Sequence, residues 1–144
     1  TGEVLYPFGY GLSYSEFRYD GVKVSPRQWR GTDKVTVSVN VTNTGAVDAD
    51  EVVQLYVSHP EVKGAPIRTL VAFKRIYIAK GRSEKVTFEL DDRSLSTVDQ
   101  NGQRSLAAGK VAIWVGGGQP EQREGLHPAA GIRAELVVTQ AKAL

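Results

Sequence analysis

Residues 35–42 read Val-Thr-Val-Ser-Val-Asn-Val-Thr, and this stretch decides what kind of fold the chain forms. Its valines alternate strictly with polar residues, which is the pattern of a strand with one buried and one solvated face. β-Branched side chains also favour the extended backbone that a sheet needs. The stretch therefore predicts a half-buried β-strand whose valines enter a hydrophobic core.

Extended patterns recur on both sides of this strand, separated by Gly, Pro and Asn turn signals. The segment 51–58 is partly apolar on both faces, so we expect it in the middle of a sheet or covered by another part of the protein. The expected core contacts of the segment 70–78 are Leu70, Phe73, Ile76 and Ile78. The other expected strands are 17–24 with an irregularity at Gly21, 86–90, 111–115 and 132–138.

The connections have signatures of their own. Residues 25–33 hold Pro26 and Gly31 and are expected to form a loop. A short helical turn is expected at 91–95, because Asp91 can cap it. Asn101-Gly102 predicts a tight turn. About seven strands without a long helix or a βαβ alternation predict an all-β, immunoglobulin-like antiparallel β-sandwich.

Composition narrows the function classes. The 144 residues allow one domain with a sizeable core, and the net charge of +2 is too small to indicate nucleic acid or a membrane surface as partner. No apolar run approaches the roughly 18 residues of a membrane span. The chain has no cysteine, which excludes disulfides and thiolate chemistry.

The sequence contains a few clusters of residues that could form a catalytic or metal site, but none has the spacing that such a site needs. Asp48, Asp50 and Glu51 lie close together but lack calcium-loop spacing, so a solvated loop is the better interpretation. For Asp91-Asp92 a helix cap is a better account than an acid pair. The remaining candidates are His59 and His127, which have no nucleophile motif beside them, and Gly116-Gly117-Gly118, which no helix start follows. We expect no catalytic residue, metal site or cofactor.

The tryptophans are candidates for carbohydrate contact, because sugars stack on indole faces. Trp114 falls on the face opposite Val111, Ile113 and Val115, whereas Trp29 lies in the expected loop beside arginines. For both, an interface or the edge of a core is the more conservative interpretation. The match of Asn40-Val41-Thr42 to a glycosylation sequon is of a kind frequent by chance.

Residues 5–14 read Leu-Tyr-Pro-Phe-Gly-Tyr-Gly-Leu-Ser-Tyr and follow neither a helical nor a strand period. Residues 1–16 are therefore expected to form an aromatic-rich linker or docking segment, and residues 17–144 the sandwich. Aromatic side chains supply large buried areas at interfaces. We expect the segment to dock onto a part of a larger protein, with Tyr6, Phe8, Tyr10, Leu12 and Tyr14 as anchors.

Together with residues 5–14, several later blocks make the chain resemble the C-terminal part of family-3 glycoside hydrolases, the β-glucosidases and β-xylosidases. The resemblance covers roughly residues 5–118 and departs from the family pattern at Asp50 and at Val71-Ala72. It implies a fibronectin type III-like domain. Its blocks are 5–14, Val-Thr-Asn-Thr-Gly at 41–45, Glu-Val-Val-Gln-Leu-Tyr-Val at 51–57, Pro-Ile-Arg-Thr-Leu at 66–70 with Phe73 and Arg75, and 108–116.

The resemblance also implies where catalysis occurs. In that family the nucleophilic Asp and the acid/base carboxylate both lie upstream of the segment that Leu5 begins. Retaining hydrolysis needs two carboxyl groups about 5–5.5 Å apart, and no residue here matches either motif. We therefore expect a non-catalytic accessory domain of a retaining β-glycosidase acting on terminal β-D-glucosyl or xylosyl residues, which stabilises the catalytic core and shapes its active-site rim.

The expected partners are the catalytic domains of the same polypeptide, or of a separate chain after cleavage, and a polysaccharide as a further option. The family favours a periplasmic or secreted location and leaves the cytoplasm open. Two alternatives use the same sandwich differently: a carbohydrate- or polymer-binding module, and an adhesive fibronectin-type interaction domain, because fold alone does not fix function.

Overall fold

The computed structural model describes residues 16–118 and 130–144, and this part of the chain consists of β-strands and their connections, with no helix. Seven strands are eight to ten residues long, and they are the seven that the sequence patterns predict. The strands are β1 (Phe17–Ser25), β2 (Gln28–Trp29), β3 (Val35–Asn43), β4 (Ala49–Ser58), β5 (Thr69–Ile78), β6 (Ser83–Leu90), β7 (Thr97–Val98), β8 (Arg104–Leu106), β9 (Gly109–Gly116), β10 (Gly131–Val138) and β11 (Lys142–Ala143).

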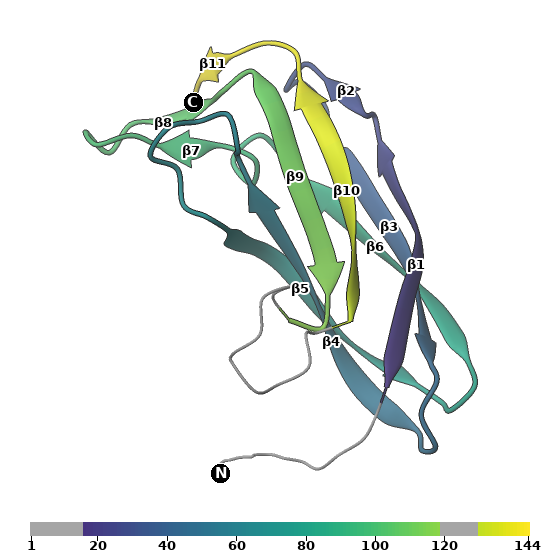
Figure 1. Cartoon of the computed structure of the whole chain (residues 1–144). Helices are drawn as coiled ribbons and strands as arrows, with labels where there is room; N and C mark the ends of the chain where they lie inside the picture. The colour runs from purple at the N-terminus through teal and green to yellow at the C-terminus, as the bar shows by residue number, and fades with distance from the viewer. Residues whose placement is uncertain (1–15, 119–129) are drawn as a thin grey trace.

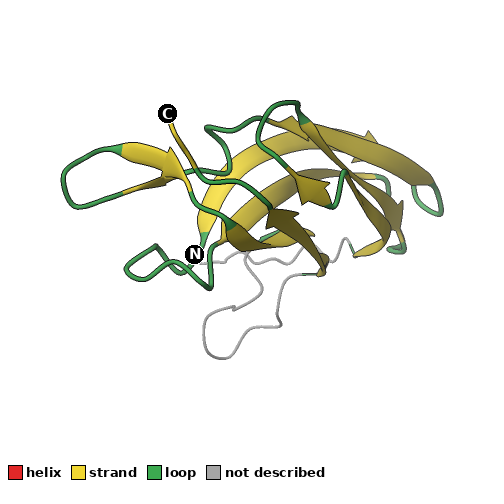
Figure 2. Cartoon of the chain, turned by 90° about the horizontal axis from the view of Figure 1, so that it is seen from above, coloured by secondary structure: helices red, strands yellow, loops and turns green. Residues whose placement is uncertain are grey.

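Two sheets lie face to face and form a β-sandwich (Figures 1 and 2). Sheet I has the order β1-β3-β6, and sheet II has the order β2-β10-β9-β4-β5. A small sheet of β11, β8 and β7 lies at the end of the sandwich where the chain terminates (Figure 1). The expected all-β sandwich is therefore confirmed.

The core lies between the two sheets and takes one side of each strand. From β3 it takes Val35, Val37, Val39 and Val41, all at most 1% exposed, as their alternation predicts. β4 pairs with both β5 and β9 and so lies inside sheet II, as its two partly apolar faces indicate. The facing strands add further valine, leucine, isoleucine and phenylalanine side chains, among them Val53, Leu55, Phe88, Leu90, Ile113 and Leu136.

The expected irregularity in the first strand is confirmed. The register between β1 and β3 shifts between Asp20 and Lys23, and Gly21 has a φ of +65°. A side chain at this position would be strained by that φ, and a Cβ there would also lie 2.7 Å from Nδ2 of Asn40. The bulge keeps Tyr19 and Val24 on the core side on either side of the extra residue.

Three local expectations need correction. Residues 25–33 contain β2, a two-residue strand that runs parallel to β10, so the sandwich is not purely antiparallel. The turn at 91–95 is not helical, although Asp91 Oδ1 accepts the backbone N–H of Ser94 as a cap would. In β5, Leu70 and Phe73 are exposed because a register shift against β4 between Leu55 and Tyr56 places both on the outer side of sheet II, and only Ile78 is fully buried.

A buried asparagine joins the two sheets at one end. Asn43 Nδ2 donates to the carbonyls of Val47 and Ile78, both at 2.9 Å, and its Oδ1 accepts the N–H of Gly45 at 2.9 Å. The side chain is fully buried, so these bonds replace the hydrogen bonds to water that it would otherwise form.

The described residues contain no helix that could cross a membrane.

Candidate binding surface

The two outer faces of the sandwich differ in chemistry. The outer face of sheet I carries no apolar side chain among the described residues, as is usual for the solvent side of a sandwich. The outer face of sheet II carries aromatic and aliphatic side chains instead. The residues of the first are Arg18, Asp20, Lys23, Ser25, Thr36, Ser38, Asn40, Thr42, Ser83, Lys85, Thr87 and Glu89, read from the pairing register.

The apolar side chains of the outer face of sheet II are strongly exposed. Val52 is 37% exposed, Leu70 45%, Phe73 65% and Tyr77 61%. They form a row across β4 and β5, because Phe73 pairs with Gln54 beside Val52, and Leu70 pairs with Tyr56. This face therefore differs from the polar outer face of sheet I and is the candidate binding surface of the described residues.

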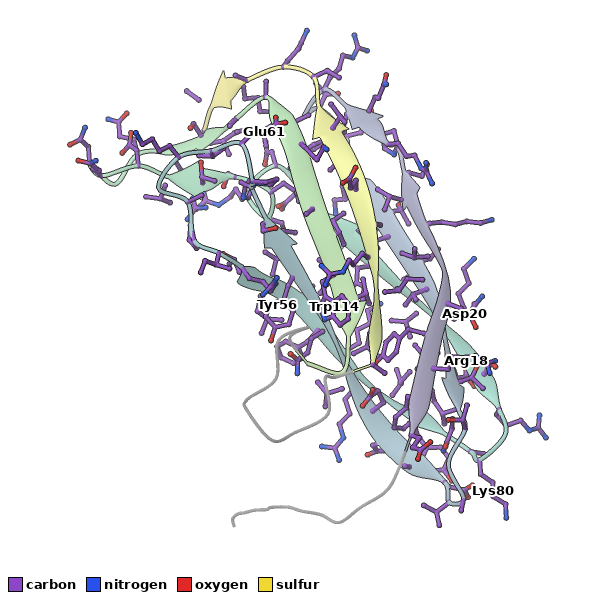
Figure 3. All side chains as sticks on the ribbon, in the orientation of Figure 1. Arg18, Asp20, Tyr56, Glu61, Lys80 and Trp114 are labelled. Atoms are coloured by element: carbon purple, nitrogen blue, oxygen red, sulfur yellow. The ribbon has the colours of Figure 1, made fainter. Side chains whose placement is uncertain are left out.

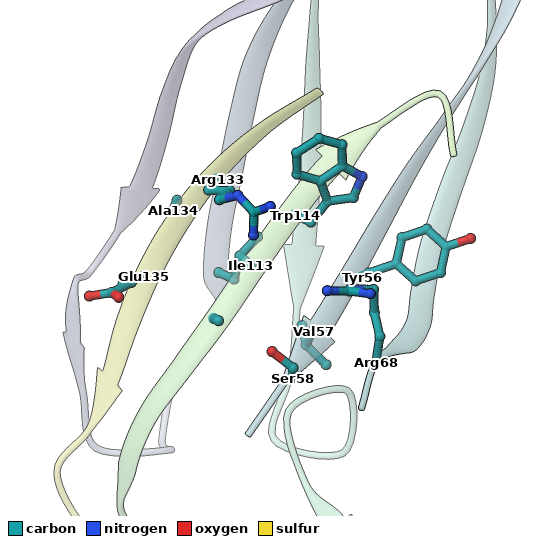
Figure 4. A pocket seen from close by; sticks show the side chains of 10 residues that line it. Tyr56, Val57, Ser58, Arg68, Ile113, Trp114, Arg133, Ala134 and Glu135 are labelled. Atoms are coloured by element: carbon teal, nitrogen blue, oxygen red, sulfur yellow. The ribbon is translucent and has the colours of Figure 1, made fainter. Parts of the chain in front are cut away.

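An open groove of about 260 Å³ continues this row over β4, β9 and β10. Tyr56 and Trp114 lie opposite each other in the strand register and stand side by side in Figure 3. The guanidinium groups of Arg68 and Arg133 flank them, and Arg68 reaches across beside the Tyr56 ring (Figure 4). The groove therefore combines an aromatic floor with two positive charges.

Trp114 is fixed against β10. A Cβ added to Gly131 would lie 2.3 Å from Cζ2 of the indole and 2.7 Å from both neighbouring ring atoms, Cε2 and Cη2. A point so close to all three atoms lies above the ring plane, so the Gly131 backbone covers one face of the indole. The guanidinium of Arg133 lies 5.3 Å from the ring centre, and Nε1–H donates to the carbonyl of Gly118 at 2.5 Å.

The polar groups of this face are paired with each other. Tyr56 Oη donates to Oε1 of Gln54 at 2.6 Å, and Arg75 contacts Asp50 at 2.8 Å. Tyr77 Oη donates to Asp48 at 3.0 Å. The hydrogen bond from the backbone N–H of Lys80 lowers the pKa of Asp48 most, and the hydrogen bond from the Tyr77 hydroxyl lowers it further. The hydrogen bond to Asp48 in turn raises the pKa of Tyr77.

The clustered carboxylates of the sequence diverge in space. Asp48 accepts from Lys80 and Tyr77, Asp50 pairs with Arg75, and Glu51 points inward to Tyr19. Tyr19 Oη donates to Glu51 Oε2 at 2.6 Å, and burial raises the pKa of both groups. No group of three potential metal ligands occurs in residues 16–118 and 130–144.

The other candidates have structural partners. The ring of buried His59 bonds through Nε2 to the carbonyl of Leu95 at 2.9 Å, and Asp92 pairs with Lys142 at 3.1 Å. The glycines at 116 and 117 allow close approach, since a Cβ on Gly117 would lie 2.7 Å from Glu51 Oε2. His127 lies outside the described residues.

The structure places the predicted contact residues differently. Trp29 is 2% exposed, with Nε1–H donating to the carbonyl of Asp33 at 2.7 Å, so its indole faces the core and not solvent. The five proposed anchors between Tyr6 and Tyr14 lie outside the described residues. Arg68, Arg133 and the row at Phe73 and Tyr77 were not predicted as surface contact residues, although the period-two spacing of Phe73, Arg75 and Tyr77 was a usable signal.

Known proteins with similar sequences include β-glucosidases and β-xylosidases. A model of the fibronectin type III-like domain matches residues 51–119. A probable β-glucosidase D of Emericella nidulans is 37% identical over 82% of this chain, which covers 17% of that protein. A putative β-xylosidase of Formosa agariphila is 39% identical over 78% of the chain, which covers 15% of it.

Solved structures agree with these relatives. β-Glucosidase 3B of Thermotoga neapolitana superposes with a TM-score of 0.75 at 27% identity, over 95% of this chain and 18% of that one. The GH3 β-glucosidase of Bifidobacterium adolescentis gives 0.71 at 32% identity, over 92% and 18%. The chain thus spans about a sixth of the length of the curated relatives it matches.

Proposed function

Because the chain is a fibronectin type III-like domain matching the C-terminal region of family-3 β-glucosidases and β-xylosidases, we propose that it is a non-catalytic accessory domain that stabilises the catalytic part of such an enzyme. The observation that carries the proposal is the small share of each relative that the chain covers, 15% to 18% in the proteins described above. Such domains lie within larger polypeptides in the relatives, which implies contact with catalytic domains.

The arrangement of polar groups supports a structural role. The clustered carboxylates Asp50, Asp48 and Glu51 are engaged in separate contacts, with Arg75, Tyr77 and Tyr19 as their respective partners. Two carboxyl groups facing one sugar about 5–5.5 Å apart would be needed for a retaining mechanism. The proposal therefore assigns hydrolysis of β-D-glucosyl or xylosyl groups to the rest of the polypeptide.

The aromatic segment at residues 1–16 is part of this proposal. Its anchors Tyr6, Phe8, Tyr10, Leu12 and Tyr14 would join the sandwich to the catalytic part by burying their rings against it. The docked domain would also border the active-site rim of the parent enzyme.

Deletion tests the proposal directly. Removing residues 17–144 from the full polypeptide is expected to lower the Tm of the catalytic part, because a large packed surface would be exposed to water. KM for an aryl β-glucoside and an aryl β-xyloside, measured on both forms, reports any effect on the rim. An unchanged Tm together with unchanged kinetics would contradict the proposal.

A further inference from the structure

The strand edges of sheets I and II differ in length and regularity. An edge strand presents unpaired N–H and C=O groups, which can pair with a strand of another molecule. On one side of the sandwich, the edge strand β1 is interrupted by the bulge at Gly21, and β2 has only two residues. The edges of the other side are β5 and β6, which are ten and eight residues long. This second side therefore needs a different form of protection.

The start of β5 has the composition of a segment that pairs readily with other strands. Residues 69–73 read Thr-Leu-Val-Ala-Phe and contain no charge, glycine or proline. Leu70 is 45% exposed and Phe73 65%. Uncharged segments of this kind on an edge strand are sites at which separate molecules associate. A register shift against β4 falls within the segment, but the pairing is regular over residues 72–78, so β5 still offers an extended edge.

Lys74 follows this segment directly and lies on the core side of its sheet. It pairs with Val53, which is fully buried in the core, so the register gives both side chains the same face of sheet II. Lys74 is nevertheless exposed, because β5 is the last strand of the sheet and the core is open beside it. A lysine can occupy such a margin, since its stem covers apolar surface while its ammonium stays near water.

The ammonium of Lys74 reaches from sheet II to the edge of sheet I. Its Nζ donates to the backbone carbonyl of Thr87 in β6 and lies 5.4 Å from the centre of the Phe88 ring. β3 pairs with β6 from the other side, so this carbonyl belongs to the free edge of β6. An open groove of about 380 Å³ runs between the two strands, with Lys74, Phe88 and Glu89 in its lining. One side chain thus occupies an acceptor on β6 and places a positive charge beside the apolar start of β5.

We propose that Lys74 protects the open side of the sandwich, keeping the edges of β5 and β6 from pairing with the same edges of a second copy of this chain. Pairing would replace the charge-assisted bond at the Thr87 carbonyl by an ordinary one from a foreign N–H. It would also enclose the ammonium groups of both copies between apolar side chains, which is costly for unpaired charges. This role does not depend on the proposed function.

The test compares Lys74→Met with Lys85→Met in the 144-residue chain. Methionine keeps an unbranched stem but has neither the charge nor the N–H donors of lysine. Lys85→Met removes the same charge from β6, where the side chain belongs to the outer face of sheet I. In sedimentation velocity, Lys74→Met is expected to raise the associated fraction severalfold, increasingly so with concentration. Lys85→Met is expected to match the unmodified chain, as is Lys74→Arg, which keeps the charge and the donors.

Two further measurements distinguish edge pairing from a simple loss of stability. In Lys74→Met, the backbone N–H groups of β5 and β6 are expected to exchange with solvent more slowly as the protein concentration rises, whereas those of β1 keep their rates. Adding Phe73→Ser to Lys74→Met is expected to lower the associated fraction again, because it removes the exposed ring from the edge.

A Lys74→Met chain that associates no more than the unmodified one would overturn the inference. Association through partial unfolding would overturn it as well. That outcome would appear as faster hydrogen exchange throughout the sandwich, a matching loss in urea unfolding, and no reversal by Phe73→Ser.

Discussion

At the scale of single residues, Asn43 determines how the chain turns between the two sheets. Its buried amide bonds to Val47, Ile78 and Gly45, and its own backbone bonds to Arg82 and Gly81. A buried carbonyl or N–H that loses its partner keeps the full cost of having left water. This one side chain therefore stabilises the turn after β3 and the end of β5 together.

Asn43→Ala is expected to lower the free energy of unfolding by about 2–4 kcal/mol, because the three hydrogen bonds of this buried side chain are lost at about 0.5–1.5 kcal/mol each. Urea unfolding followed by circular dichroism measures this. Asn40→Ala, in the same strand but exposed, is the matched control and should change the value by no more than about 0.5 kcal/mol. Equal effects of the two variants would contradict this account of Asn43.

Tyr19 and Glu51 give the stability a specific pH dependence. Burial raises the pKa of Glu51, while the hydrogen bond from Tyr19 works against that rise. The folded chain therefore holds this proton more tightly than the unfolded chain. The resulting stability is full below the ordinary carboxyl pKa and is lost as pH rises through the raised value.

Tyr19→Phe removes the donor to the carboxylate and is expected to cost about 1.5–3 kcal/mol at an alkaline pH above the raised pKa of Glu51, where the carboxylate is charged. The cost should be smaller at pH 4, where Glu51 gains a proton and the bond is no longer assisted by charge. Urea unfolding of both proteins at the two pH values measures the difference. Tyr77→Phe, whose hydroxyl meets an exposed carboxylate, should show no such large effect, and a pH-independent cost for Tyr19→Phe would refute the coupling.

At the scale of elements, the pairing of β9 with β10 is adjusted to one large side chain. Trp114 occupies the space that a side chain at Gly131 would need. Gly131→Ala is therefore expected to cost about 1–3 kcal/mol and to shift the tryptophan emission, since the indole must move. In a Trp114→Ala background the same change should be nearly neutral, and additive effects in this double-mutant cycle would exclude the contact.

The elements were largely predictable from sequence, because each long strand has one apolar side facing the core. Val35 to Val41 show this most clearly, and β4 was recognised as central because both of its sides are apolar. β2 was not predictable: its two residues pair with β10 across more than one hundred positions, and nothing local specifies that pairing.

The candidate surface was harder to predict than the strands. Leu70 and Phe73 have the composition of core residues, and only the register of β5 on β4 shows that they point outward. The role of Trp29 depended on the same kind of information, because its neighbours in sequence are charged while its neighbours in space are core residues. Side-chain type predicts burial, but sheet register decides which surface receives an exposed aromatic residue.

At the scale of the whole molecule, stability comes from the shared core and owes little to surface charge. The ion pairs Arg18–Asp20, Lys34–Glu89, Arg75–Asp50 and Lys110–Glu135 are all largely exposed, and the net charge is +2. The free energy of unfolding is therefore expected to change by less than about 1 kcal/mol between about 0.05 and about 0.5 M NaCl. The Debye length falls roughly threefold between these two concentrations. Urea unfolding at both concentrations checks this, and a steep loss with salt would show that ion pairs matter more than burial.

The direction of the strands has a mechanical consequence. β1 enters at one end of the sandwich and β10 leaves at the other, and both run along its long axis (Figure 1). A tension applied between Phe17 and Val138 would load the β1–β3 and β9–β10 ladders in shear, so that many hydrogen bonds resist at once instead of opening one by one. The domain is thus arranged as a stiff link between the points where the chain enters and leaves it.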